Sequence, residues 1–421
     1  MTVARERCYI TAVATGDLRL TRHRALAEIP AEAWNALACP METPLLEWEW
    51  LNRLEQSGSI SPETGWIPAH MAVWQGDRLV GAAPLYERTH SMGDFVFDFA
   101  WADVARQIGA PYYPKLVGMS PATPVSAYRF LLTPELPQEE LTRRLIEEIR
   151  EFTTAHEIHG IAFNFADPEW VPEVEAHGFT TWLHQGFTWY NPGYRSFDDY
   201  LAELNKNQRR NIRKERRAME DYGVRLETLR GTEAPDRYFS LMYDLYEVHN
   251  EQFGPFAAKF LNRAFFEGLA DSCRHRVLFV AAHEGSAEEP FAMAMLLTKG
   301  GLLVGRYWGS FYFVDKLHFN ACYYEPIRWA IENGIREFDP GMGSPHKIKR
   351  GFRAVPTYSL HYFHDERMRL IMEGNIDRIN AFERENIEEL NAELPFARKP
   401  GARNHGGGTD TPSPQRRGDA R

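Results

Sequence analysis

Apolar residues recur along this chain with two different spacings, which predict alternating helices and strands. Residues 70–74 and 79–86 are apolar runs separated by a short glycine turn, a pattern typical of a β-hairpin. Residues 139–157 carry apolar side chains at helical spacing and lead into the strand-like run 160–165. Residues 178–189 are expected to extend the same sheet.

The second half repeats this plan, although it shows no sequence identity to the first half. A long helix, a strand, two helices, two hairpin strands and a third strand are predicted at residues 197–222, 224–229, 235–252, 257–271, 276–282, 291–298 and 301–308. The pattern predicts an α/β (α+β) fold, with mixed, mostly antiparallel sheets flanked by helices. We place domains at 1–193 and 194–396, and we expect a disordered tail at 397–421, which is rich in Gly, Pro and Arg.

One block of the second half combines an acid, a glycine turn and several cations. A helix is predicted over 317–333, followed by the strand 335–339 and the turn Pro340-Gly341-Met342-Gly343. The cationic segment 346–352 comes next. Glycine turns leave backbone N–H groups available and let a ligand approach closely, so we expect a ligand site here. Pro326 is expected to kink the helix that precedes this turn.

Length, charge and cysteine content limit the class of protein. A chain of 421 residues predicts two domains. The net charge of -10 argues against a nucleic-acid-binding protein, although it leaves room for a local basic patch. The four cysteines form no Cys-x-x-Cys pair, which predicts a reduced, cytoplasmic protein without a structural zinc site or disulfides. No apolar run approaches the roughly 20 residues needed to span a membrane, and residues 1–17 lack the core of a signal peptide.

Short motifs spread over nearly the whole chain, except the tail, carry a family resemblance. They are Tyr112-Tyr113-Pro114-Lys115-Leu116, Thr123-Pro124-Val125, residues 205–217, Arg306-Tyr307-Trp308-Gly309, Ala321-Cys322-Tyr323-Tyr324, and residues 325–330, 333–339 and 346–352. In these motifs the chain resembles the Fem-like branch of the GNAT acyltransferase superfamily. Within that branch it is similar to a bacterial group described as predicted N-acyltransferases or peptidoglycan biosynthesis/recognition proteins. The resemblance implies two tandem GNAT-like domains with a substrate cleft between or beside them.

The donor-binding motif that the resemblance implies is only half present. GNAT enzymes that bind acetyl-CoA usually carry Arg/Gln-x-x-Gly-x-Gly/Ala before the crossover helix. Here Arg306-Tyr307-Trp308-Gly309-Ser310-Phe311 keeps the first half and lacks the second small residue. Arg306 and Trp308 remain donor-binding candidates, but the departure favours a donor other than acetyl-CoA.

A basic segment near the start of the second half predicts an anionic partner. On a helix, Lys206, Arg210, Arg213 and Arg217 fall on one stripe, with Arg209 beside them. Arginine suits bidentate contacts with phosphate, so the partner would be a CoA diphosphate, a nucleotide-linked precursor, a phospholipid head or a tRNA acceptor stem. The alternative is a solvated face that pairs with neighbouring glutamates.

N-acyl transfer requires a group that takes the proton of the amine and groups that polarise the carbonyl. Glu325, Asp339 and His346 are the candidate proton acceptors. Backbone N–H groups of the turn at Gly341 and Gly343 can bind the developing oxyanion, and Lys347, Lys349 and Arg350 can bind a phosphate or a carboxylate. The structural alternatives are that Asp339 caps the turn, that Glu325 pairs with a nearby cation, and that His346 is a loop residue.

The sequence hypothesis is a cytoplasmic bacterial N-acyltransferase with an acyl-CoA or aminoacyl-tRNA as co-substrate. No tightly bound cofactor is expected. The amine acceptor is expected to be related to a peptidoglycan precursor, as the resemblance implies. The alternative is a non-catalytic protein of the same fold that binds an anionic polymer, a cell-wall precursor or RNA.

Overall fold

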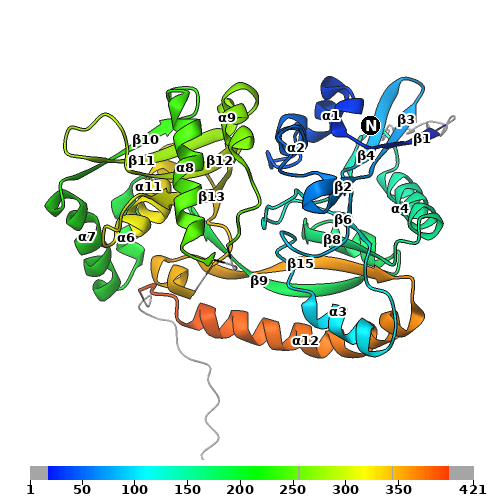
Figure 1. Cartoon of the computed structure of the whole chain (residues 1–421). Coiled ribbons are helices and arrows are strands. Elements are labelled where there is room, and N and C mark those ends of the chain that lie inside the picture. The colour runs from blue at the N-terminus through cyan, green and yellow to red at the C-terminus, as the bar shows by residue number, and fades with distance from the viewer. Residues whose placement is uncertain (1–17, 255–256, 344, 398–421) are drawn as a thin grey trace, which may run out of the picture.

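The computed structural model describes residues 18–254, 257–343 and 345–397. Its strands form a sheet of four strands and a sheet of eleven strands, with helices packed around both (Figure 1). The predicted tail from residue 398 onwards lies outside the described residues.

The first half carries the whole small sheet and one end of the large sheet. Its strands are β1 (Leu18–His23), β2 (Trp66–Pro68), β3 (His70–Gln75), β4 (Arg78–Ala83), β5 (Tyr86–Arg88), β6 (Lys115–Gly118), β7 (Leu131–Leu132), β8 (Gly160–Ala166) and β9 (Thr180–Tyr190). Its helices are α1 (Ala31–Ala38), α2 (Trp48–Gln56), α3 (Phe99–Gln107), α4 (Gln138–Ala155) and α5 (Val171–Glu175). The predicted hairpin is β3 and β4, which pair antiparallel.

The second half supplies the other end of the large sheet. Its strands are β10 (Val224–Arg230), β11 (Val277–Glu284), β12 (Ala292–Lys299), β13 (Leu302–Ser310), β14 (Glu337–Asp339) and β15 (Arg353–Phe363). Its helices are α6 (Phe197–Glu203), α7 (Lys206–Asp221), α8 (Arg237–Glu251), α9 (Arg263–Ser272), α10 (Leu317–Phe319), α11 (Glu325–Glu332) and α12 (Glu366–Ala392). The π-helical turn Asn320–Tyr324 joins α10 to α11.

Two long strands join the halves into one sheet. The order of the large sheet is β10-β11-β12-β13-β14-β9-β15-β8-β6-β5-β2. β9 precedes the predicted boundary and pairs with β14 of the second half, while β15 pairs with β8 of the first half. Figure 1 shows β9, β15 and α12 running along the base of the molecule beneath both halves. The boundary at residue 193 remains a prediction, because the halves share this sheet.

The helix α12 is held against the two long strands by asparagine side chains. Asn380 accepts a hydrogen bond from the backbone N–H of Leu183 and donates one to the carbonyl of Thr181, each at 2.8 Å. Asn391 makes the same pair of bonds with the backbone of Ala354, at 3.0 and 2.8 Å. An asparagine side chain offers both a donor and an acceptor, so it can form hydrogen bonds with the backbone N–H and C=O groups of a strand that face a helix.

Two predicted helices differ in detail. The long helix expected over 197–222 is two helices, because Leu204 is extended and the Asn205 side chain caps α7 by accepting from the N–H of Gln208.

Pro326 does not break a continuous α-helix. It lies in the first turn of α11, directly after the π-helical turn, where the ring and the missing N–H disturb no regular bond.

Candidate active site

The candidate active site forms where two neighbouring strands of the large sheet separate. β13 and β14 pair in parallel from Leu302 with Glu337 to Val304 with Asp339. β14 then ends, because Pro340 has no N–H to continue the ladder, while β13 runs on to Ser310. Asp339 therefore lies at the fork between the strands, at the start of the glycine turn.

The carboxyl group of Asp339 is held in place by its own turn. One oxygen accepts a hydrogen bond from the N–H of Gly341 at 2.7 Å, so this N–H is not available for an oxyanion. The side chain is half-buried. Burial raises its pKa from 3.8 to about 6, although the Gly341 N–H, Lys347 and Arg306 act in the opposite direction. A carboxyl group that titrates near neutral pH suits a general base.

Glycine is required in this turn because the backbone packs directly on β13. Gly341 has a φ of +77°, and a Cβ there would lie 3.2 Å from the carbonyl oxygen of Gly305. A Cβ on Gly305 would in turn lie 3.3 Å from the backbone of Pro340. This close approach fixes the position of Asp339 relative to Arg306, which follows Gly305 in β13.

A β-bulge aims Arg306 at the other half of the molecule. The ladder between β12 and β13 slips by one residue at this point, so Arg306 faces no partner residue. Its guanidinium donates to the carbonyl of Ala122 at 2.8 Å and to the hydroxyl of Tyr307 at 3.2 Å. Its Nε is buried without a hydrogen-bond partner among the described residues. The predicted donor-binding arginine thus bridges the two halves beside Asp339.

Two of the three cations expected to bind an anionic ligand are instead buried and paired within the protein. Lys347 donates to two carbonyls of the glycine turn at 2.6 and 3.0 Å, and burial lowers its pKa to about 8. Arg350 forms an ion pair with Glu215 at 3.1 Å and lies 3.6 Å above the ring of Phe319. The two side chains therefore brace the turn, which corrects the expectation that they face a ligand. Lys349 is exposed.

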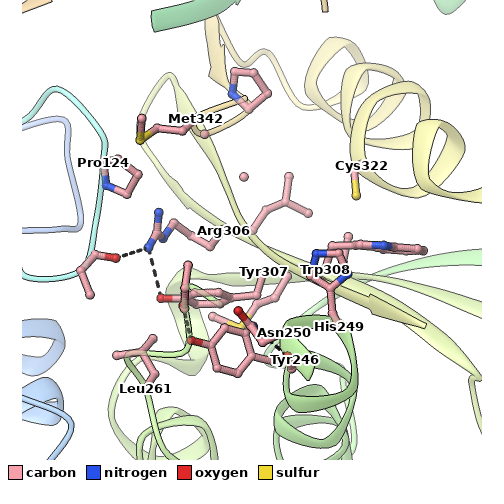
Figure 2. A pocket seen from close by; sticks show the side chains of 18 of the residues that line it. Pro124, Tyr246, His249, Asn250, Leu261, Arg306, Tyr307, Trp308, Cys322 and Met342 are labelled. Carbon is pink, nitrogen blue, oxygen red and sulfur yellow. Dashed lines mark hydrogen bonds between the residues drawn. The ribbon is translucent and has the colours of Figure 1, made fainter. Parts of the chain in front are cut away.

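A cavity of about 430 Å³ opens beside the glycine turn and between the two halves. Figure 2 shows Pro124 of the first half on one side of it, and Trp308 and Cys322 of the second half on the other. We call it the central cavity. Trp308, a predicted donor-binding residue, lines this cavity with its ring edge-on to His318 at 5.5 Å.

His346 lies behind the wall of the central cavity. Its Nε2 is 3.1 Å from the hydroxyl of Tyr323, which itself lines the cavity. Burial and the nearby cations Arg350 and Lys347 lower the pKa of His346, so its imidazole is neutral at pH 7. Of the three candidate proton acceptors, Asp339 lies at the strand fork. His346 is separated from the central cavity by the side chain of Tyr323.

A second cavity, of about 330 Å³, lies on the other side of the turn. It shares Phe95, Pro124, Gly341 and Met342 with the central cavity, so the two cavities meet at the turn. We call it the acceptor cavity. Two carboxyl groups and several aromatic rings line it: Asp339, Glu383, Phe97, Phe165, Trp182 and Phe187. Acids and aromatic faces both favour a cationic amine.

The structure places Glu325 apart from Asp339. Glu325 lines a third cavity, of about 520 Å³, together with Arg216 and Arg217 but with no residue of the glycine turn. Its carboxylate is paired with Arg216 at 3.0 Å and with Arg328 at 2.7 Å. Because both oxygens are held by guanidinium groups, we leave Glu325 out of the candidate active site.

The basic stripe on α7 points outward. Lys206, Arg210, Arg213 and Arg217 are exposed, and none of them lines the central or the acceptor cavity. Arg209 is half-buried and donates to backbone carbonyls at the end of α6, at 3.0 and 3.2 Å. The stripe is therefore a surface separate from both of these cavities.

A hydrogen-bonded chain of three side chains at the acceptor cavity had no signal in the sequence. His184 Nε2 lies 2.7 Å from the Ser359 hydroxyl, which lies 2.8 Å from His361 Nε2. Burial lowers the pKa of His184 to about 4 and that of His361 to about 3. Since the hydroxyl has one proton, it donates to one imidazole and accepts from the other, which sets opposite tautomers. Only the pairing of β9 with β15 brings these residues together.

A buried ionic network fixes the segment that carries Phe95 to both cavities. Arg88 pairs with Asp94 at 2.9 Å, and Lys115 pairs with Asp94 at 2.9 Å and with Asp98 at 2.6 Å. All four side chains are buried, and the two carboxylates flank Phe95 in the chain. Charges that are paired in this way hold the backbone between them in one conformation.

Within the part of the chain that the structure describes, no three His, Cys, Asp or Glu side chains gather to hold a metal ion. None of the described helices combines the length and the apolar character needed to cross a membrane.

The fold is similar to that of several solved structures. The architecture resembles FemX, with 13% identity over 84% of this chain and 100% of that chain and a TM-score of 0.51. It also resembles the C-terminal domain of a putative lysylphosphatidylglycerol synthetase from Agrobacterium fabrum (10% identity, 84% and 97% covered, TM-score 0.51). A tandem GNAT protein from the clavulanic acid biosynthesis pathway matches at 11% identity (82% and 98% covered, TM-score 0.44). The expected fold class, mixed and mostly antiparallel sheets flanked by helices, is thus confirmed.

The family follows from the sequence. A model of the FemAB-like family, described as peptidoglycan biosynthesis/recognition, matches residues 25–398. This chain belongs to that family, as the sequence motifs predicted. A search of curated proteins finds no matching sequence. The family and the fold together support a transferase role connected with peptidoglycan biosynthesis.

Proposed function

We propose that this protein is an N-acyltransferase that moves an acyl or aminoacyl group from an activated donor to an amine, with Asp339 as the general base. The observation that carries the proposal is the meeting of two cavities at the glycine turn, directly after Asp339, a half-buried carboxyl group that lines the acceptor cavity and whose pKa is raised to about 6. The donor enters the central cavity and the amine enters the acceptor cavity. The family description supports an acceptor related to a peptidoglycan precursor.

The chemical step needs no covalent enzyme intermediate. The amine nitrogen attacks the acyl carbonyl carbon, and Asp339 takes the proton that the nitrogen loses. A C–N bond forms and the bond from the carbonyl carbon to the donor sulfur or oxygen breaks. The proton that Asp339 took from the nitrogen passes to that sulfur or oxygen, so the leaving group departs as a thiol or hydroxyl. Arg306 lines the central cavity, and its guanidinium charge is placed to polarise the carbonyl.

The first test compares donors on the purified protein. A ligand that binds only the folded state raises the melting temperature, so acyl-CoA and aminoacyl-tRNA are added separately in a thermal shift assay. Transfer is then followed by mass spectrometry, with a peptidoglycan precursor that carries a free amine as the acceptor. Consumption of either donor with mass gain on the acceptor is the expected result. If neither donor is consumed and neither shifts the melting temperature, the proposal is overturned.

The role of Asp339 is tested with a matched pair of variants. Asp339→Asn should lower kcat by about 10²- to 10⁴-fold, the range that general bases contribute. Asp77→Asn, which changes an exposed carboxylate in the β3–β4 turn, should keep the wild-type rate. Wild-type activity in Asp339→Asn would remove this residue from the mechanism.

A second candidate function rests on the stripe of α7. Four exposed cations on one helix face of a protein with a net charge of -10 favour binding of an anionic polymer or RNA without catalysis. In that case affinity for RNA should fall steeply with salt and should be lost in Arg210→Glu, while Asp339→Asn binds normally.

A further inference from the structure

Resting on the proposed N-acyl transfer, we propose that the transferred acyl group is an apolar chain of medium length, seated in the central cavity, and that it is neither acetyl nor aminoacyl. The proposal concerns the substrate class of the site described above. It stands on the lining, the size and the rim of this cavity.

The described lining of the central cavity offers no carboxylate to pair with a positive charge. None of the described residues that line it is Asp or Glu. Among the same described residues the one Lys or Arg is Arg306, which is already held by the Ala122 carbonyl and the Tyr307 hydroxyl. An aminoacyl group would bring an ammonium group into this space, where removal from water is unfavourable without a carboxylate.

The polar atoms of the lining are largely occupied by other protein groups. The Tyr246 hydroxyl donates to the Ala258 carbonyl at 2.8 Å and accepts from the Phe260 N–H at 2.9 Å. The Asn250 amide donates to the Tyr246 carbonyl at 2.8 Å. Two imidazoles, of His249 and His318, also line the cavity, and burial lowers the pKa of both, so they carry no charge at pH 7. What remains toward the cavity is chiefly aromatic and aliphatic surface, which Figure 2 shows around Tyr307, Trp308 and Leu261.

The central cavity is too large to be filled by an acetyl group. An apolar cavity of about 150 Å³ holds one benzene molecule. The central cavity, at about 430 Å³, is nearly three times as large. On the same scale it has room for a chain on the order of ten carbon atoms, even when part of the space holds the arm of the donor.

The rim of the cavity exposes large apolar side chains. Phe253 is 51% exposed and Met342 is 44% exposed, and both line the central cavity. Apolar residues exposed together at the mouth of a cavity mark a surface that a ligand covers. An apolar acyl chain would bury both.

The test is a chain-length series of acyl-CoA donors, from acetyl through butyryl and octanoyl to dodecanoyl, with one amine acceptor. Burial of one methylene contributes about 0.8 kcal/mol, so kcat/KM should rise about fourfold for each added carbon until the cavity is full. Thermal stabilisation by the same donors should rise in the same order. Aminoacyl-tRNA is assayed beside them.

Two variants report on the cavity itself. Cys322 lies on the cavity wall (Figure 2), so Cys322→Phe should move the preferred chain to shorter lengths. Cys39→Phe, the same change at an exposed position, should leave the preference unchanged. In case Cys322→Phe fails to fold, Phe253→Glu at the exposed rim should lower kcat/KM for octanoyl-CoA about tenfold, the loss expected for one partly buried aromatic contact.

The outcomes separate this inference from the proposed function. Transfer that favours acetyl-CoA or aminoacyl-tRNA over octanoyl-CoA would overturn the inference while the proposed function stands. Chain-length-dependent stabilisation without turnover of any donor would support an apolar ligand in the cavity and overturn acyl transfer. A flat response to chain length in both assays would overturn the inference.

Discussion

Replacing Asp339 with asparagine should stabilise the folded protein at neutral pH while it removes activity. The pKa of this carboxyl is 3.8 in its ordinary setting and about 6 in the folded protein. Between these two pH values the folded state binds more protons than the unfolded state. Stability contributed by the protonated group is therefore lost as the pH rises through this window.

The magnitude follows from the size of the shift. At 1.36 kcal/mol per pKa unit the full effect is on the order of 3 kcal/mol, and the partial exposure of the side chain reduces it to about 2 kcal/mol. Asparagine keeps a side-chain oxygen for the hydrogen bond from the Gly341 N–H, which is 2.7 Å long in the wild type. The substitution thus removes the charge and leaves the turn in place.

The assay is urea unfolding at pH 4 and at pH 7.5, monitored by tryptophan fluorescence. Asp339→Asn should exceed the wild type in free energy of unfolding by about 2 kcal/mol at pH 7.5 and by less than about 1 kcal/mol at pH 4. Asp77→Asn should differ from the wild type by the same small free energy of unfolding at both pH values. The same difference for Asp339→Asn at the two pH values would refute the raised pKa, and with it the argument for a general base.

Three further predictions concern stability. Lys115→Met should cost about 3–5 kcal/mol in urea unfolding because it leaves buried carboxylates unpaired, and a loss as small as that of Arg106→Met, in an exposed pair, would contradict this. Gly341→Ala should lower the melting temperature more than Gly58→Ala, since both have positive φ but only Gly341 has backbone within 4 Å of a Cβ; equal losses would show that the close approach to β13 is unimportant. Ser359→Ala should cost about 1–3 kcal/mol, because a buried and a half-buried imidazole lose their shared hydroxyl, and an unchanged unfolding midpoint would argue against the hydrogen-bonded chain.

Elements with a strong local pattern were predictable from the sequence. The hairpin of β3 and β4, the helix α4 and the strands β10 to β13 all have periodic apolar residues and clear turns, and they lie close to the predicted ranges. The split between α6 and α7 was missed, because the two extended residues Leu204 and Asn205 do not interrupt the apolar spacing. The π-helical turn before Pro326 was also not predicted, since such a turn has no distinct local pattern.

The candidate site was only partly visible before the structure. Asp339, its glycine turn and Arg306 were found because an acid beside glycines after a strand is a local feature. Lys347 and Arg350 were assigned to a ligand on charge alone, and the structure shows that burial commits them to the protein. Glu383 of the acceptor cavity, on α12, was not found at all, because nothing in its neighbourhood distinguishes it from the other acids of that helix.

The sequence by itself determined the order of helices and strands, the family, and the strand end that carries Asp339. These properties depend on residues close together in the chain, whose spacing and turn chemistry are visible in one dimension. Only the tertiary structure decided that β9 and β15 cross between the halves, that two cavities meet at the glycine turn, and that Glu325 lies elsewhere. Those facts depend on which distant segments pair and which side chains lose contact with water, and no local pattern records either.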